Sequence, residues 1–137
     1  MEFRRVSDPL PLANRRVLVV EDQYLVADEM RRTVISLGGE VLGPVPRARL
    51  ALELLGEQSI DLALLDINLG GEEVYPLAGE LMRRGRPIMF ATGCEPWVIP
   101  EEFKAVPRLE KPLTARALTD SIERLGIQPH GRGTTAC

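Results

Sequence analysis

The most constraining feature of the chain is a regular alternation of short apolar runs with segments of helical periodicity. Runs of strand length occupy residues 16–20, 40–42, 62–65, 87–91 and 108–110. Segments with apolar residues three or four positions apart occupy residues 24–37, 47–55, 75–84 and 114–125. Repeated βα units produce this alternation. We therefore predict an α/β fold, a doubly wound parallel sheet of five strands.

Glycine, proline and capping residues set the ends of these predicted elements. The first helix is expected to stop at Gly38-Gly39 and the second strand at Gly43-Pro44. Thr114 is the expected N-cap of the last helix. The buried helix stripes are expected to be Leu25, Met30, Val34 and Leu37, then Leu50, Leu54 and Leu55, and finally Leu118, Ile122 and Leu125.

One stretch breaks the alternation. Between the fourth and fifth strands, the sequence GCEPWVIPEEFKAVP contains Pro96, Pro100 and Pro107. Proline lacks a backbone donor and clashes with the preceding turn, so this density of prolines leaves room for about one or two helical turns. We predict a short or irregular fourth helix in a mobile segment.

Composition bounds the domain organisation and the partners. The 137 residues, 45% of them hydrophobic, suit one domain over residues 16–126, between a flexible segment 1–15 and a disordered tail 127–137. A net charge of −3, without a basic cluster interleaved with aromatics, argues against nucleic-acid binding. No apolar run is long enough for a membrane span, and the start of the chain lacks the apolar region of a signal peptide. We expect a cytoplasmic protein that does not bind membranes.

Cysteine and histidine are scarce. The chain has two cysteines, Cys94 and Cys137, and a single histidine, His130. Cys137 and His130 lie in the polar end QPHGRGTTAC, where a disulfide framework or a fixed catalytic geometry is not expected. Histidine-based triads, multi-histidine metal sites and autokinase activity are therefore disfavoured.

Polar residues follow the apolar runs. They are Glu21 and Asp22 after the first run, Asp66 after the third, Thr92 after the fourth and Lys111 after the fifth. Right-handed crossovers make all five strands parallel, so these residues meet at one rim of the sheet. With strand order 2-1-3-4-5, the crevice opens between strands one and three, where Asp22 and Asp66 face each other. Converging carboxylates without histidine or cysteine favour a hard cation, and we predict a Mg²⁺ site.

The same residues predict phosphoryl chemistry. Mg²⁺ held by few carboxylates typically completes its shell with phosphate oxygens. Asp66 would then be a nucleophile that forms an acyl phosphate, with Lys111 and Thr92 as the cationic and hydroxyl partners of the phosphoryl group. Asn68 is placed to offer Mg²⁺ its backbone carbonyl, and Gly70-Gly71 lets the loop turn tightly beside the site.

The runs VVEDQ, LLDIN, FATG and EKPL, in this order, resemble the receiver domain of bacterial two-component response regulators over about residues 15–126. The resemblance implies a flavodoxin-like (βα)5 fold, no fused output domain, and a signalling phosphoacceptor rather than an enzyme. It implies phosphorylation of Asp66 by a histidine kinase or phosphotransfer protein, and a message passed to a downstream protein or along a phosphorelay. The roles it implies are Mg²⁺ ligation by Glu21, Asp22, Asp66 and the Asn68 carbonyl, phosphoryl contacts from Thr92 and Lys111, and a cis bond between Lys111 and Pro112.

The chain also departs from the family pattern. Arg108 stands where the family usually has an aromatic switch residue, three positions before the lysine. The FATG run resembles the FATGUY subgroup of stand-alone receivers, which work with kinases of the HWE or HisKA2 type. Here Cys94 fills the hydrophobic place and Glu95 replaces the tyrosine, with Trp97 two residues later as a candidate aromatic or a simple packing residue.

We hypothesise that phosphorylation of Asp66 draws the Thr92 hydroxyl inward and orders the segment from Gly93 to Val106. Three alternatives stay open. A haloacid-dehalogenase-like phosphatase would need an Asp-x-Asp run after the first strand, where this chain has EDQ. A flavodoxin-like nucleotide binder would need glycines in that loop. The third is a pseudo-receiver that binds partners independently of phosphate.

Overall fold

The computed structural model describes residues 9–93 and 99–129. The elements are β1 (Arg16–Val20), α1 (Tyr24–Ser36), β2 (Glu40–Val45), α2 (Ala48–Leu55), β3 (Leu62–Asp66), β4 (Asn68–Leu69), β5 (Glu72–Glu73), α3 (Tyr75–Arg83), β6 (Ile88–Thr92), the 3₁₀ helix η1 (Glu101–Phe103), β7 (Arg108–Glu110) and α4 (Ala115–Arg124). None of the helices in these two ranges is both long and apolar enough to cross a membrane.

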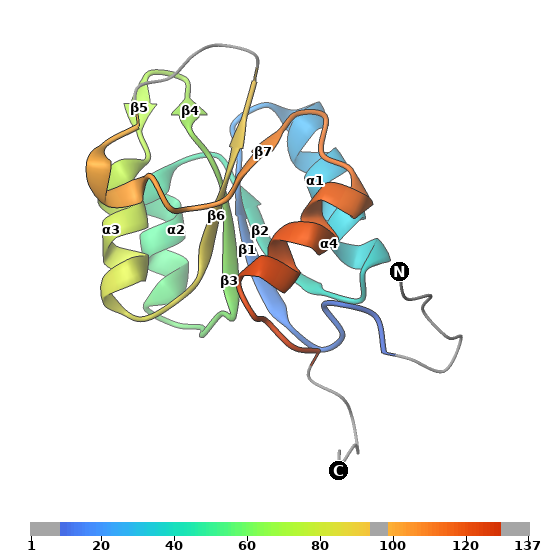
Figure 1. The fold of residues 1–137 in the computed structure, drawn as a ribbon. Coiled ribbons are helices and arrows are strands. Elements are labelled where there is room, and N and C mark those ends of the chain that lie inside the picture. The colour runs from blue at the N-terminus through green and yellow to red at the C-terminus, as the bar shows by residue number, and fades with distance from the viewer. Residues whose placement is uncertain (1–8, 94–98, 130–137) are drawn as a thin grey trace.

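Five strands form one parallel sheet in the order β2-β1-β3-β6-β7. The short strands β4 and β5 pair with each other as a separate antiparallel hairpin. Strands β6 and β7 are therefore the predicted fourth and fifth strands, and the predicted order 2-1-3-4-5 is confirmed. Helices α1 and α4 cover one face of the sheet, and α2 and α3 cover the other (Figure 1). The fold is doubly wound, as the alternation of apolar runs predicts.

Side-chain alternation along each strand divides the core into two clusters. In β1, Leu18 and Val20 pack on the face with α2 and α3, whereas Val17 and Val19 pack on the face with α1 and α4. Every residue of the central strand β3 is buried. A strand covered on both faces reads as a continuous apolar run, which explains why the central strands are recognisable from sequence.

Helix α1 corrects one predicted stripe. The apolar spacing predicts a buried Leu25, but its side chain is 80% exposed, and Ala27 takes its place beside Met30 and Val34. Leu25 precedes Met30 by five residues, which at 3.6 residues per turn places it about 140° around the helix. The buried stripe therefore begins later in the helix than predicted.

Strand β2 corrects one predicted boundary. The strand is expected to end at Gly43-Pro44, yet it continues to Val45. The register against β1 shifts between Leu18 and Val20, so the glycine and proline sit in an irregularity of an edge strand. Gly43 has φ +98°, and a Cβ there would stand 2.8 Å from the Val45 nitrogen. The close backbone approach requires glycine at this position.

The residues before β1 are part of the packed domain. Leu12 is fully buried against the face with α1 and α4, and its N–H donates to the Leu37 carbonyl at 2.8 Å. Arg15 Nε donates to the Gln128 carbonyl at 2.7 Å. Residues 9–15 thus differ from the flexible segment expected over 1–15. Residues 1–8 and 130–137 lie outside the described ranges.

The short fourth helix is confirmed. Only the three residues of η1 are helical between β6 and β7 in the described part of that segment. Phe103 of η1 stacks on Tyr75 at a ring-centroid distance of 5.3 Å, and both rings contact Phe90 edge-on at 6.0 Å. This aromatic trio attaches η1 to the sheet. Residues 94–98, with Cys94, Glu95 and Trp97, lie outside the described ranges.

Candidate functional site

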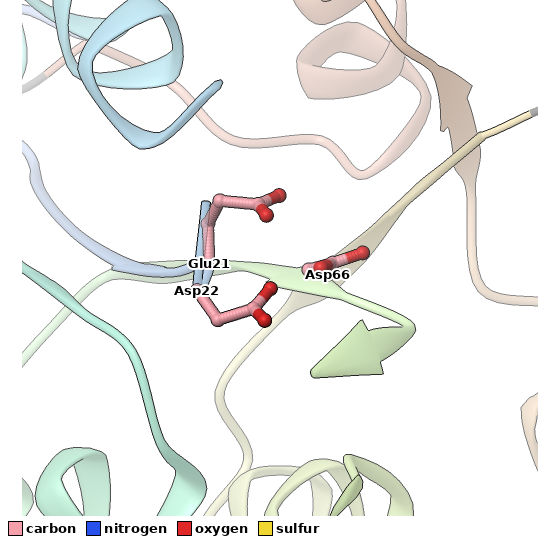
Figure 2. Close-up of side chains that lie close together, drawn as sticks. All are labelled: Glu21, Asp22 and Asp66. Atoms are coloured by element: carbon pink, nitrogen blue, oxygen red, sulfur yellow. The ribbon is translucent and has the colours of Figure 1, made fainter. Parts of the chain in front are cut away.

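The ends of the two central strands bring three carboxyl groups together. Glu21 and Asp22 follow β1 directly, and Asp66 is the last residue of β3. Because Val20 pairs with Leu65, the next residues of the two strands lie side by side. One carboxylate oxygen from each of the three residues lies within 4.8 Å of the others. Figure 2 shows the three side chains extending toward the same space.

Lys111 joins two of these carboxylates. Its Nζ lies 2.8 Å from Glu21 Oε1 and donates to Asp66 Oδ1 at 2.9 Å. The Lys111 N–H donates to the Thr92 carbonyl at 2.8 Å, which anchors the lysine backbone to the end of β6. The Lys111–Pro112 bond is cis, the geometry that the resemblance implies. Burial alone would lower the pKa of Lys111, but its contacts with Glu21 and Asp66 outweigh burial and raise that pKa above 10.5.

Glu21 carries a charge that its surroundings do not fully balance. Its side chain is 2% exposed. Burial raises its pKa from 4.5 to about 7, opposed by Lys111 and by the Gln23 N–H and reinforced by the charge of Asp66. The Gln23 N–H donates to Oε2 at 3.1 Å. Among the described residues, the enclosed Oε1 has no hydrogen bond of good geometry and forms only the ion pair with Lys111. The Lys111 ammonium therefore contacts two of the three acids and is shared between them.

This donor set fits a hard divalent cation. All three groups are carboxylates, and oxygen ligands suit Mg²⁺. The under-bonded Glu21 Oε1 is the kind of buried atom that a cation would satisfy. Glu21, Asp22 and Asp66 would hold the ion. The structure thus assembles three of the four predicted ligands.

Asn68 lies beside this cluster. It is exposed at the start of β4, and its N–H donates to Asp66 Oδ1 at 3.2 Å. Its side-chain oxygen accepts from the Gly71 N–H at 3.4 Å. The observed contacts of Asn68 therefore fix the Asp66 carboxylate and the following turn.

Of two further predicted residues, one reaches the rim and the other does not. Thr92 ends β6, whose Ala91 pairs with Asp66, and its hydroxyl donates to the Gly93 carbonyl at 3.2 Å rather than to the carboxylates. Arg108 begins β7, pairs with Phe90 two residues below the rim, and is exposed. The structure therefore does not place Arg108 in the carboxylate cluster.

Sequence reasoning missed one contributor to this rim. Arg47, which the sequence marks only as the start of the second helix, sends its Nη1 across to the Leu69 carbonyl at 3.3 Å. The intervening Gly70 approaches Asp22 closely, since a Cβ on Gly70 would stand 2.9 Å from Asp22 Oδ2. An arginine before a helix has no distinctive sequence signal, so only the fold reveals this placement.

Among curated proteins, the chain is similar to bacterial signal-transduction proteins. No family model matches the chain. Sensory transduction protein LytT of Bacillus subtilis is 26% identical over 113 residues, covering 80% of this chain and 47% of LytT. Response regulator protein FleR of Pseudomonas aeruginosa is 31% identical over 115 residues, covering 80% of this chain and 24% of FleR. The chain spans about half the length of LytT and about a quarter of FleR.

Solved structures match more completely. SdrG from Sphingomonas melonis Fr1 aligns with a TM-score of 0.74 and 32% identity, over 85% of this chain and 98% of the SdrG chain. Its BeF3-activated conformation aligns with a TM-score of 0.70 and 33% identity, over 82% and 97% of the two chains. The signal receiver domain of a modulated diguanylate cyclase from Desulfovibrio desulfuricans G20 aligns with a TM-score of 0.69 and 32% identity, over 81% and 92%.

Proposed function

Because the chain belongs to the family of response-regulator receiver domains, we propose that it accepts a phosphoryl group on Asp66 in a Mg²⁺-dependent reaction. The donor is a phosphohistidine on a partner histidine kinase or phosphotransfer protein. The observation that carries the proposal is the environment of Asp66. Its carboxyl group is 2% exposed, ends the central strand β3, and has Oδ1 bonded to both Lys111 Nζ and the Asn68 N–H.

The contacts of Asp66 assign different roles to its two carboxylate oxygens. Oδ1 is engaged, so Oδ2 is the oxygen that attacks phosphorus. A new bond forms between Oδ2 and phosphorus, and the bond from phosphorus to the donor nitrogen breaks. The donor imidazole leaves with the electron pair, as a neutral ring when its other nitrogen is protonated. Asp66 attacks as the carboxylate and needs no general base.

Lys111 holds the charge that the transfer places on Asp66. Its ammonium already lies between Asp66 and Glu21, so it needs no reorganisation to stabilise the developing acyl phosphate. Bound Mg²⁺ would neutralise further charge on the phosphoryl oxygens. Thr92 has its hydroxyl on the Gly93 carbonyl in the present conformation, and we assign to it a turn toward the phosphoryl group.

That turn supplies the proposed switch. The Thr92 hydroxyl leaves the Gly93 carbonyl, which changes the backbone at the start of the segment running to Val106. The downstream end of this segment is attached to the core through Phe103. We assign the output to this segment, because a change at Thr92 has a direct path into it.

The likeness to SdrG supports a finer assignment. The FATG run that ends β6 and the 32% identity to SdrG favour the FATGUY subgroup and a kinase of the HWE or HisKA2 type. The alignment covers 98% of the solved SdrG chain, which supports a receiver unit of about this length. We assign signalling by protein contact or phosphorelay, with the chain as a phosphoacceptor rather than an enzyme with a substrate of its own.

The test combines two reagents with two variants. Acetyl phosphate with Mg²⁺ is followed by intact mass, and beryllofluoride with Mg²⁺ is followed by amide NMR shifts. The wild type and Asp120→Asn, which removes an exposed carboxylate on α4, are expected to gain one phosphoryl group. Asp66→Asn is expected to gain none. A wild type that responds to neither reagent would return the function to a phosphate-independent binding module.

A further inference from the structure

The second helix begins at a residue that also contacts the loop after Asp66. Arg47 is the N-cap of α2, with an extended backbone at φ −138° and ψ 147°, and its side chain is exposed. Its Nη1 donates to the carbonyl of Leu69 in β4 at 3.3 Å. The neighbouring Ala48 N–H donates to Glu72 Oε1 of β5 at 3.1 Å. Both strands of the hairpin are therefore attached to the start of α2.

Gly70, at the turn of this hairpin, shows how close Arg47 comes to the carboxylate cluster. It has φ +62°, and a Cβ on it would stand 2.9 Å from Asp22 Oδ2 and 3.5 Å from Arg47 Nη1. The guanidinium and the Asp22 carboxylate thus both border the space that a side chain on Gly70 would occupy. The absence of a side chain on Gly70 leaves the space between them open.

Two cationic side chains therefore lie beside the carboxylate cluster, and they differ in what they contact. Lys111 lies on the side of Glu21 and Asp66 and contacts both. Arg47 lies on the side of Asp22, and in the part of the chain that the structure describes it makes no ion pair. A guanidinium has five N–H donors, and the Leu69 carbonyl engages one of its nitrogens. The remaining donors are available to an anion at the rim.

We propose that Arg47 binds the phosphoryl group of the incoming donor at the Asp22 side of the site, and that its charge opposes Mg²⁺ binding while no phosphoryl group is present. The inference rests on the proposed phosphoacceptor function and deepens it. The ligand is a dianionic phosphoryl group on an acyl phosphate or a phosphohistidine. Guanidinium groups suit such groups because they donate several parallel hydrogen bonds.

The two halves of the proposal predict changes of opposite sign. Removing the charge at Arg47 is expected to strengthen Mg²⁺ binding by about threefold, the order given by Coulomb repulsion over several ångströms in a solvent-exposed site. The same change is expected to slow phosphorylation by about tenfold, because a charge-assisted hydrogen bond to the donor is lost. General damage to the site would weaken both properties together.

The experiment compares wild type, Arg47→Gln, Arg47→Lys and Arg49→Gln. Arg49 is on the same helix, exposed and paired with Glu53 at 3.4 Å, so its substitution changes the net charge equally away from the cluster. Mg²⁺ affinity is measured by calorimetry without a phosphoryl donor. Initial phosphorylation by acetyl phosphate at saturating Mg²⁺ is measured by intact mass at two salt concentrations, with thermal unfolding as the folding check.

The expected pattern is tighter Mg²⁺ binding and slower phosphorylation in Arg47→Gln and wild-type behaviour in Arg49→Gln. Arg47→Lys restores the charge but not the parallel donors, so it is expected to recover the wild-type Mg²⁺ affinity and only part of the phosphorylation rate. High salt is expected to shrink the rate difference, since exposed charges are screened. Equal losses of metal affinity and rate in Arg47→Gln, or an unchanged rate, would overturn the role of Arg47. A wild type that gains no phosphoryl group would instead overturn the proposed function, and the inference with it.

Discussion

Replacing Glu21 by glutamine is expected to stabilise the metal-free protein at alkaline pH. The Glu21 side chain is buried, its pKa is raised from 4.5 to about 7 by that burial, and one ammonium is shared with Asp66. Between these two pH values the folded state binds more protons than the unfolded state. The stability of the wild type therefore falls as pH rises through this window and levels off above it.

The size of the effect follows from the two pKa values. At about 1.36 kcal/mol for each pH unit, the rise from 4.5 to about 7 corresponds to about 3 kcal/mol. The amide side chain of the Glu21→Gln variant would carry no charge at any pH and so would escape this loss. The difference in unfolding free energy between the variant and the wild type is expected to grow by about 2 to 3 kcal/mol between pH 5 and pH 8.

Urea unfolding in EDTA, repeated with saturating Mg²⁺, measures this difference. In EDTA the gap between Glu21→Gln and wild type is expected to widen with pH, whereas Glu57→Gln, at an exposed glutamate after α2, should follow the wild type. Mg²⁺ should stabilise the wild type at pH 8 and have little effect on Glu21→Gln, because a ligand of the ion is gone. A gap in EDTA that stays constant with pH would refute the assignment of an unbalanced charge to Glu21.

Two further pairs of substitutions test the loop and the N-terminal segment. Gly70→Ala should weaken Mg²⁺ binding measured by calorimetry, because its Cβ would stand 2.9 Å from Asp22 Oδ2. Gly71 has φ +96° and nothing within 4 Å of its Cβ position, so Gly71→Ala should lower the stability of the fold without lowering the metal affinity. Leu12→Ala should lower the unfolding free energy by about 2 to 5 kcal/mol in urea, since Leu12 is fully buried. Leu10→Ala, at a side chain 44% exposed, should cost far less; equal costs would contradict the packing of residues 9–15.

The rim of the sheet could be predicted because strand ends are a topological property. Buried parallel strands read as continuous apolar runs, so the first polar residue after each run marks its carboxyl end. Asp66 and Lys111 come from segments 45 residues apart, yet both strand ends meet once the order is known. Parallel strands and this strand order place both residues at one rim, where the long Lys111 side chain reaches Asp66 at 2.9 Å.

The features that escaped prediction depend on side-chain direction and on loops. Leu25 is apolar but precedes Met30 by five residues, so its side chain points away from the buried stripe, and its apolar character alone was misleading. The β4–β5 hairpin forms in the loop after β3, and Arg47, from the loop before α2, donates to Leu69 in it. Contacts between two loops leave no periodic pattern in a sequence. Leu12 escaped because an apolar residue among prolines and polar residues resembles any linker.

The contact between Arg15 and Gln128 determines where fluorescent probes can be attached to this domain as a reference pair. It joins a residue near the start of the described chain to one near its end, at the end of the sheet where β1 starts. The carboxylate cluster lies at the opposite end, where β1 and β3 finish. In Figure 1 this puts the entry and exit of the domain below the sheet and the β4–β5 hairpin above it. Fluorophores attached near residues 9 and 129 would keep a constant separation during phosphorylation. They would serve as an internal reference, against which a third probe beside the hairpin could report the switch.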